Sequence, residues 1–215
     1  APGKEPDRGD DLVGWFRTLG AVTARMHAHV RAWPLPPAFR RQHWDFDTMF
    51  GDRPIWGSWR AGIGLEPQGE AVLGRALDLV RRRTLRFGRG EARYGLVHAD
   101  LRLANLLVDG DRLTVIDFDD CGFSWLAYDF AAAVSFMEDD PTVPALLAAW
   151  AEGYRTVAPL AAEDEAEMPV FLAMRRILLV GWLASHSEVP IARELGAGYT
   201  AGAVAMADRL LQRFA

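Results

Sequence analysis

Three polar residues in the middle of the chain have a spacing that suits phosphoryl transfer. Asp100 is followed by Asn105 and then by Asp117. Phosphoryl transfer needs a carboxylate that receives the proton of the acceptor hydroxyl, and oxygen ligands that hold Mg²⁺. Asp100 is therefore a candidate for the base, or for the residue that orients the acceptor, and Asn105 and Asp117 are candidate magnesium ligands.

Two short apolar runs predict how these residues meet. Residues 106–108 and 113–116 are β-prone, and the intervening residues 109–112 carry a hairpin turn signal. Antiparallel pairing would place Asn105 and Asp117 side by side at the open end of the hairpin. Asp100 would lie in the loop that leads into the first strand.

The same segment resembles a known group of enzymes. Residues 98–105 read His-x-Asp-x-x-x-x-Asn, residues 116–118 read Ile-Asp-Phe, and residues 128–131 read Tyr-Asp-Phe-Ala. This pattern is similar to the catalytic segment of the aminoglycoside phosphotransferase and choline kinase superfamily, whose members are relatives of the protein kinases. The resemblance implies ATP- and Mg²⁺-dependent transfer of the γ-phosphate to a hydroxyl. It also implies that His98 and Asp129 support the catalytic loop.

Further charged residues near this segment each admit two interpretations. Asp119 and Asp120 could each aid metal binding or bind a cationic acceptor. Alternatively, they could be solvated turn residues or partners of a nearby Arg. Glu138 could line an acceptor pocket, but a solvated helix terminus is the favoured interpretation.

Arg102 lies inside the loop and is a further catalytic candidate. It could offset negative charge on the transferring phosphoryl group or on an acidic substrate. Alternatively, it could pair with Asp129 or Glu91 and so brace the loop. Many members of the superfamily have Gly at the position of Ala99 and a different sequence at 102–104, which bears on the shape of the acceptor site.

The sequence lacks the signals of a nucleotide-clamping lobe. Its single lysine, Lys4, stands in a polar, Pro- and Gly-containing segment, and neither a Gly-x-Gly-x-x-Gly loop after a strand nor a Walker A sequence is present. We therefore interpret the chain as the C-terminal lobe alone, with the N-terminal lobe missing. We expect this lobe by itself to bind nucleotide weakly and to transfer phosphate poorly.

Composition narrows the class of protein. The chain has 215 residues, is 50% hydrophobic and carries a formal net charge of −5, which predicts one domain over 1–215 and no general attraction to nucleic acid or membrane. The single Cys121 suits a reducing cytoplasm, and no apolar run approaches the roughly 20 residues of a membrane span. Residues 1–9 are polar and are expected to be disordered.

Hydrophobic periodicity predicts a mostly helical chain around one small β element. The expected fold is α+β and predominantly α, the C-terminal lobe of a protein-kinase-like fold. The Trp-rich segment 32–68 could wall an acceptor site, but packing against the helices is favoured, and the basic run 81–89 is expected to be a solvated helix end. The expected helices cover residues 10–31, 45–50, 69–87, 127–138, 142–157, 163–187 and 190–213.

Three functional hypotheses follow. The first is a kinase for a small hydroxyl acceptor such as an amino alcohol, a hydroxy amino acid, a sugar or an aminoglycoside. The second is a bacterial Ser/Thr protein kinase of the same superfamily. The third is a non-catalytic binding or regulatory module. Retention of Asp100, Asn105 and Asp117 together argues against the third.

Overall fold

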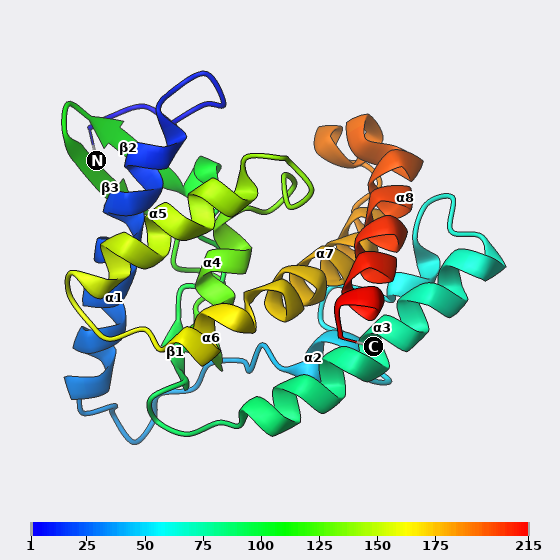
Figure 1. Cartoon of the computed structure of the whole chain (residues 1–215), viewed down its shortest axis with the longest axis horizontal. Coiled ribbons are helices and arrows are strands. Elements are labelled where there is room, and N and C mark those ends of the chain that lie inside the picture. The colour runs from blue at the N-terminus through cyan, green and yellow to red at the C-terminus, as the bar shows by residue number, and fades with distance from the viewer. Residues whose placement is uncertain (1, 215) are drawn as a thin grey trace. The chain divides into compact units, whose positions relative to one another are not determined.

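The computed structural model describes residues 2–214, which divide into two compact units (Figure 1). The first unit combines residues 1–43 with residues 89–168, and the second combines residues 44–88 with the chain from Pro169 on. The one domain expected from the sequence is thus built as two units, and the first is interrupted in sequence by part of the second.

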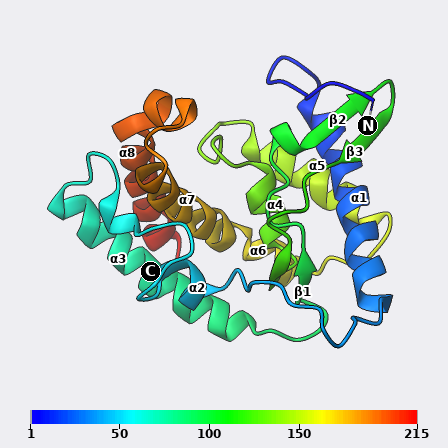
Figure 2. The same cartoon turned by 180° about the vertical axis from the view of Figure 1, so that it is seen from behind.

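The first unit is built on two helices, α1 (Leu12–Ala32) and α5 (Val143–Arg155), which pack side by side in both views (Figures 1 and 2). The Asp11 side chain caps α1 by accepting a hydrogen bond from the Gly14 amide. At the crossing, a Cβ on Gly20 would overlap the Trp150 carbonyl, and one on Gly153 would overlap the Arg17 carbonyl. Glycine at both positions therefore permits the close approach of the two helices.

Short strands of the first unit form two antiparallel pairs, where the sequence predicted one hairpin. β2 (Leu106–Asp109) pairs with β3 (Arg112–Val115) as expected, and Leu106 lies opposite Val115. β1 (Tyr94–Val97) pairs with β4 (Gly122–Trp125), a pairing that the sequence analysis missed. The loop between β1 and β2 contains one turn of 3₁₀ helix, η2 (Leu103–Asn105).

The N-terminal segment differs from the disorder expected for residues 1–9. Residue 1 lies outside the described residues, but Lys4 forms an antiparallel bridge with Val108 of β2. The Lys4 amide donates to the Val108 carbonyl at 3.0 Å, and the Val108 amide donates to the Lys4 carbonyl at 2.8 Å. The open edge of the hairpin therefore orders this segment by supplying hydrogen-bond partners.

Two of the expected helices in the later part of the chain are shorter or divided. The helix expected over 127–138 is α4 (Tyr128–Ala133), and Phe136 just beyond it has a φ of 66°, which a helix cannot contain. The helix expected over 163–187 is split into α6 (Ala162–Ala166) and α7 (Met168–Ser185).

The second unit is helical throughout its regular structure. It contains α2 (Phe46–Phe50), η1 (Trp59–Ala61), α3 (Pro67–Phe87), α7 from Pro169 on, and α8 (Pro190–Arg213), which is kinked at Gly196. α3 packs against α8 (Figure 1).

Packing accounts for the Trp-rich segment, as the sequence analysis favoured. Trp44 and Trp59 are buried, and the ring centroids of Trp44 and Trp56 lie 4.7 Å apart.

The basic run 81–89 lies at the end of α3. The guanidinium of Arg83 lies 3.9 Å from the centre of the Phe214 ring. Other arginines of this run face solvent at the end of α3, as expected for a solvated helix end.

α7 differs from the expectation that no apolar run approaches the length of a membrane span. By length and composition it could cross one, with a mean hydropathy of 1.4, but 78% of it is buried inside the structure. Such burial is usual for a core helix of a soluble protein, so this single helix is weak evidence for a membrane span.

Candidate active site

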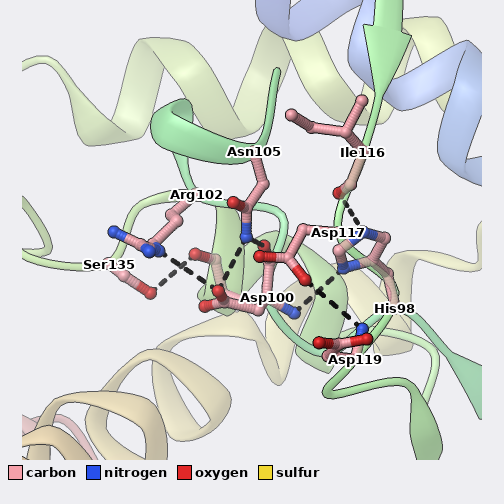
Figure 3. Close-up of polar contacts among 9 residues, drawn as sticks. His98, Asp100, Arg102, Asn105, Ile116, Asp117, Asp119 and Ser135 are labelled. Carbon is pink, nitrogen blue, oxygen red and sulfur yellow. Dashed lines mark hydrogen bonds and ion pairs between the residues drawn. The ribbon is translucent and has the colours of Figure 1, made fainter.

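The hairpin brings Asn105 and Asp117 to neighbouring positions, as its sequence predicted. The Ile116 amide donates to the Asn105 carbonyl at 3.0 Å, directly beside the β2–β3 pairing. Asp117 follows Ile116, and its carboxylate lies on the same side of the loop as Asn105 and Asp100 (Figure 3). The hairpin and the loop before it therefore bring together the amide of Asn105 and the carboxylates of Asp100 and Asp117. Asp100 and Asp117 are 17 positions apart in sequence.

Asp100 is held by donors from its own loop. Its Oδ2 accepts hydrogen bonds from Asn105 Nδ2 at 2.7 Å and from Arg102 Nε at 3.1 Å (Figure 3). Asn105 Nδ2 also donates to the Asp100 carbonyl at 2.8 Å. The side-chain nitrogen of Asn105 thus donates to Asp100, and the side-chain oxygen of Asn105 is the atom that could bind a cation.

Arg102 has a partner that the sequence analysis did not consider. The expected alternatives for an ion pair were Asp129 and Glu91, but the guanidinium pairs with Asp100 at 3.1 Å. The separation of two residues along an extended loop brings these side chains together directly. The Arg102 side chain is 38% exposed, so it also faces solvent beside the carboxylate that it contacts.

Asp117 and Asp119 are exposed, in contrast to Asp100. Asp117 Oδ1 accepts a long hydrogen bond of 3.4 Å from the Asp119 amide, and the Asp119 carbonyl accepts one from Arg41 Nη1 at 3.0 Å. Among residues 2–214, no group of three or more His, Cys, Asp or Glu side chains could hold a metal ion. The oxygen donors of Asn105 and Asp117 fit a hard cation that keeps water and phosphate oxygens as its other ligands.

Asp129 contacts the backbone of the loop that leads to Asp100. Its side chain is completely buried, and its two oxygens accept hydrogen bonds from the Ala99 amide at 2.7 Å and the His98 amide at 3.2 Å. The His98 ring spans the loop as well, because its Nε2 contacts the Ile116 carbonyl at 3.0 Å and its Nδ1 accepts from the Asp100 amide at 3.3 Å. Through these hydrogen bonds, Asp129 and His98 hold the backbone of residues 98–100 and of Ile116.

His27 is a residue of this network that the sequence analysis missed. Its Nε2 lies 2.9 Å from Asp129 Oδ2, and both side chains are buried. Burial raises the pKa of Asp129, but the hydrogen bond and the charge of His27, with smaller contributions from His98 and the Ala99 amide, outweigh burial and lower it. The available signal was the position of a polar residue on the buried face of α1, shared with Phe16 and Ala24.

Tyr154 extends the same network from α5. Its hydroxyl lies 3.0 Å from His27 Nδ1. Burial, the largest influence, raises the pKa of Tyr154 to about 12, although the charge of Arg31 acts in the opposite direction. Tyr154 is therefore protonated throughout the physiological pH range.

The remaining candidates lie in different surroundings. Asp120 is partly buried, and its carbonyl accepts a hydrogen bond from Gln42 Nε2 at 3.4 Å. Glu138 is only 4% exposed, so the solvated helix terminus favoured by the sequence analysis is wrong for this residue. Cys121 is half-buried, and burial raises the pKa of its thiol.

Two residues of the site have left-handed backbone conformations. Ala99 has a φ of 69° and Asp117 a φ of 64°. This region is costly for residues with a Cβ and persists only where the surroundings enforce it. At Ala99 the enforcing contact is the hydrogen bond from its amide to Asp129.

Comparisons with known proteins show which family this chain belongs to. Residues 1–163 match the model of the phosphotransferase enzyme family (APH). The chain is 30% identical over 193 residues to the amicoumacin kinase of Bacillus subtilis strain 168, covering 85% of this chain and 54% of that protein. It thus spans about half the length of this curated relative.

Two solved kinase structures are also similar to this chain. A microcompartment-associated aminopropanol kinase is 45% identical, with a TM-score of 0.88, and the match covers 94% of this chain and 63% of that one. An amicoumacin kinase in complex with AMP-PNP, Ca²⁺ and Ami is 24% identical, with a TM-score of 0.73 and coverage of 99% and 63%. The second likeness concerns the fold alone.

Proposed function

Because this chain belongs to the phosphotransferase enzyme family, we propose that it carries the acceptor-activating and metal-binding residues of a small-molecule kinase. The observation that carries the proposal is the meeting of Asp100, Asn105 and Asp117 around one hairpin. These are the groups that phosphoryl transfer from ATP to a hydroxyl requires.

In the proposed reaction, Asp100 orients the acceptor hydroxyl and receives its proton. The acceptor oxygen forms a bond to the γ-phosphorus of ATP, and the bond from that phosphorus to the bridging oxygen breaks, so that ADP leaves. The hydrogen bonds from Asn105 and Arg102 hold the Asp100 carboxylate in one orientation. Positioning of this kind supplies much of the rate of such enzymes.

Asn105 and Asp117 would hold Mg²⁺ through one amide oxygen and one carboxylate, with Asp119 next to them as a further candidate. A bound Mg²⁺ would neutralise charge on the phosphate oxygens. Arg102, half-exposed beside Asp100, would compensate negative charge on the phosphoryl group.

The acceptor that we propose is a small amino alcohol. The support is the 45% identity to a structure described as an aminopropanol kinase. Asp119, Asp120 and Glu138 provide acidic groups in the first unit that suit a cationic acceptor. We place the reaction in the cytoplasm, for which the single cysteine is the supporting feature.

The groups that clamp the triphosphate are proposed to come from an N-terminal lobe outside this sequence. The support is that the 215 residues contain neither a Gly-rich phosphate loop nor a lysine in a regular strand. We therefore expect the 215-residue chain alone to turn over well below the roughly 1–100 s⁻¹ of kinases. Turnover in that range from the isolated chain would contradict this part of the proposal.

The test is ATP-dependent phosphorylation by the protein that contains this chain, with a panel of acceptors. The panel holds 1-amino-2-propanol, a hydroxy amino acid, a sugar, an aminoglycoside and a dephosphorylated protein. We expect the amino alcohol to have the highest kcat/KM, and Asp100→Asn to lower kcat by about 10²–10⁴-fold.

The matched control is Asp111→Asn, which makes the same change at the exposed hairpin turn and should retain activity. Phosphorylation of the protein substrate alone would instead assign a protein kinase. An Asp100→Asn enzyme as active as the parent would contradict the role of Asp100, and absence of transfer to every acceptor would favour a non-catalytic module.

A further inference from the structure

We propose that His27 and Tyr154 are positioning residues of the phosphotransfer site, which they influence through Asp129 and the strained Ala99. The proposal rests on the proposed function and deepens it. Neither side chain belongs to the catalytic loop: His27 lies on α1 and Tyr154 on α5.

A continuous line of buried hydrogen bonds joins these helices to the loop. Tyr154 Oη lies 3.0 Å from His27 Nδ1, and His27 Nε2 lies 2.9 Å from Asp129 Oδ2. Asp129 in turn accepts from the amides of His98 and Ala99. The next residue along the chain is Asp100, so the line ends one peptide bond before the proposed base.

The ring of His27 is held at both nitrogens by members of this line. Tyr154 keeps its proton, because burial raises its pKa to about 12, and it can donate to His27 Nδ1. An ionised carboxylate can only accept hydrogen bonds, so His27 Nε2, which faces Asp129, carries a proton and donates to it. The contact of the Tyr154 hydroxyl with Nδ1 holds the imidazole ring in the orientation that directs Nε2 at Asp129.

Burial makes this donation matter for the position of the loop. Asp129 is 0% exposed and accepts from three donors, so its carboxylate has no water to replace a lost partner. Without the His27 donor, the carboxylate can turn or become protonated. Its hold on the Ala99 amide, and with it the left-handed conformation at φ 69°, would then weaken.

The helix crossing keeps the two positioning residues in register. Gly153 precedes Tyr154 and contacts the Arg17 carbonyl, while Gly20 contacts the Trp150 carbonyl. A side chain at either glycine would force the helices apart. The His27 and Tyr154 rings extend from these two helices, and their centroids lie 5.8 Å apart.

The first test measures amide hydrogen exchange of His98 and Ala99 by NMR in His27→Leu, His27→Gln and Tyr154→Phe proteins. Leu removes the donor, whereas Gln can keep a nitrogen donor near the position of Nε2. We expect exchange of the Ala99 amide to be about tenfold faster in His27→Leu and about two- to threefold faster in the other two variants. His29→Leu, on an exposed face of α1, is the control and should leave exchange unchanged.

The second test combines His27→Leu with Ala99→Gly. Glycine adopts a positive φ without strain, so it reduces the need for the brace. If His27 acts through Ala99, His27→Leu should lower kcat about tenfold with little change in KM, and Ala99→Gly should restore at least about half of that loss on a logarithmic scale. A role in helix packing alone would lower Tm but would not be relieved at Ala99.

Two outcomes would overturn the inference. One is an Ala99 amide that exchanges at the parental rate in a folded His27→Leu protein. The other is the same loss of kcat with and without Ala99→Gly. If His27→Leu fails to fold, Tyr154→Phe with unchanged Ala99 exchange and unchanged kcat is the contradicting result. Exchange is measured without turnover, so a protein with no kinase activity would refute the proposed function while the link from His27 to Ala99 is still tested.

Discussion

Two aspartates that follow the hairpin in sequence, Asp117 and Asp129, lie in opposite surroundings. Asp129 is completely buried, and its oxygens accept from His27, His98 and Ala99. Asp117 is exposed, and one of its oxygens accepts a single long hydrogen bond from the Asp119 amide. The difference matches the two roles that we propose: the buried carboxylate holds the loop backbone, and the exposed carboxylate binds a metal ion from outside the chain.

The sharpest way to break this comparison is Asp129→Asn. The variant replaces a buried, hydrogen-bonded carboxylate by a group that cannot accept from all three donors. We expect the free energy of unfolding to fall by about 3–5 kcal/mol, as for other broken buried pairs. Urea unfolding measures this value, and Asp119→Asn, at an exposed position, should stay within about 0.5 kcal/mol of the parent. Equal losses in both variants would refute the distinction.

Asp117→Asn tests the other half of the comparison. This change removes a charge from an exposed group, so the free energy of unfolding should change by less than about 0.5 kcal/mol. Affinity for Mn²⁺, used as a spectroscopic substitute for Mg²⁺, should fall at least about tenfold. Titration followed by electron paramagnetic resonance measures the affinity, with Asp111→Asn as the control. Unchanged affinity would remove Asp117 from the proposed metal site.

The smallest expected effect is on the pH dependence of stability. The pKa of Asp129 is lower in the folded protein than the value of about 3.9 in unfolded chains. Its stabilising contribution is therefore complete above that value and is lost as pH falls through the lower folded pKa. Asp129→Asn should show a shallower loss of stability below about pH 4 in acid titrations followed by circular dichroism. A parallel acid limb in both proteins would contradict the lowered pKa.

The parts of the site that the sequence predicted are local. Asn105 and Asp117 are joined by a hairpin whose strands and turn lie between them, so the spacing alone predicts their meeting. The same holds for most helices, whose apolar residues repeat at regular intervals. Arg102 shows the limit of this reasoning, because the sequence offers several acidic partners for it and only the folded backbone selects Asp100.

The parts that the sequence did not predict depend on contacts between distant segments. Nothing near His27 in sequence indicates that Asp129 and Tyr154 lie beside it, and β1 pairs with β4 across the whole hairpin. Lys4 was expected in a disordered segment because its neighbours are polar. Its order comes from the unpaired edge of β2, which no local pattern reveals.

The interrupted order of the first unit has a consequence for biosynthesis. His27 is made 102 residues before Asp129 and 127 residues before Tyr154, with residues 44–88 of the other unit in between. On a ribosome, α1 emerges long before the helix that it packs against. The nascent chain therefore exposes the apolar face of α1 until α5 has been synthesised, and the catalytic loop takes its final shape only at that late stage.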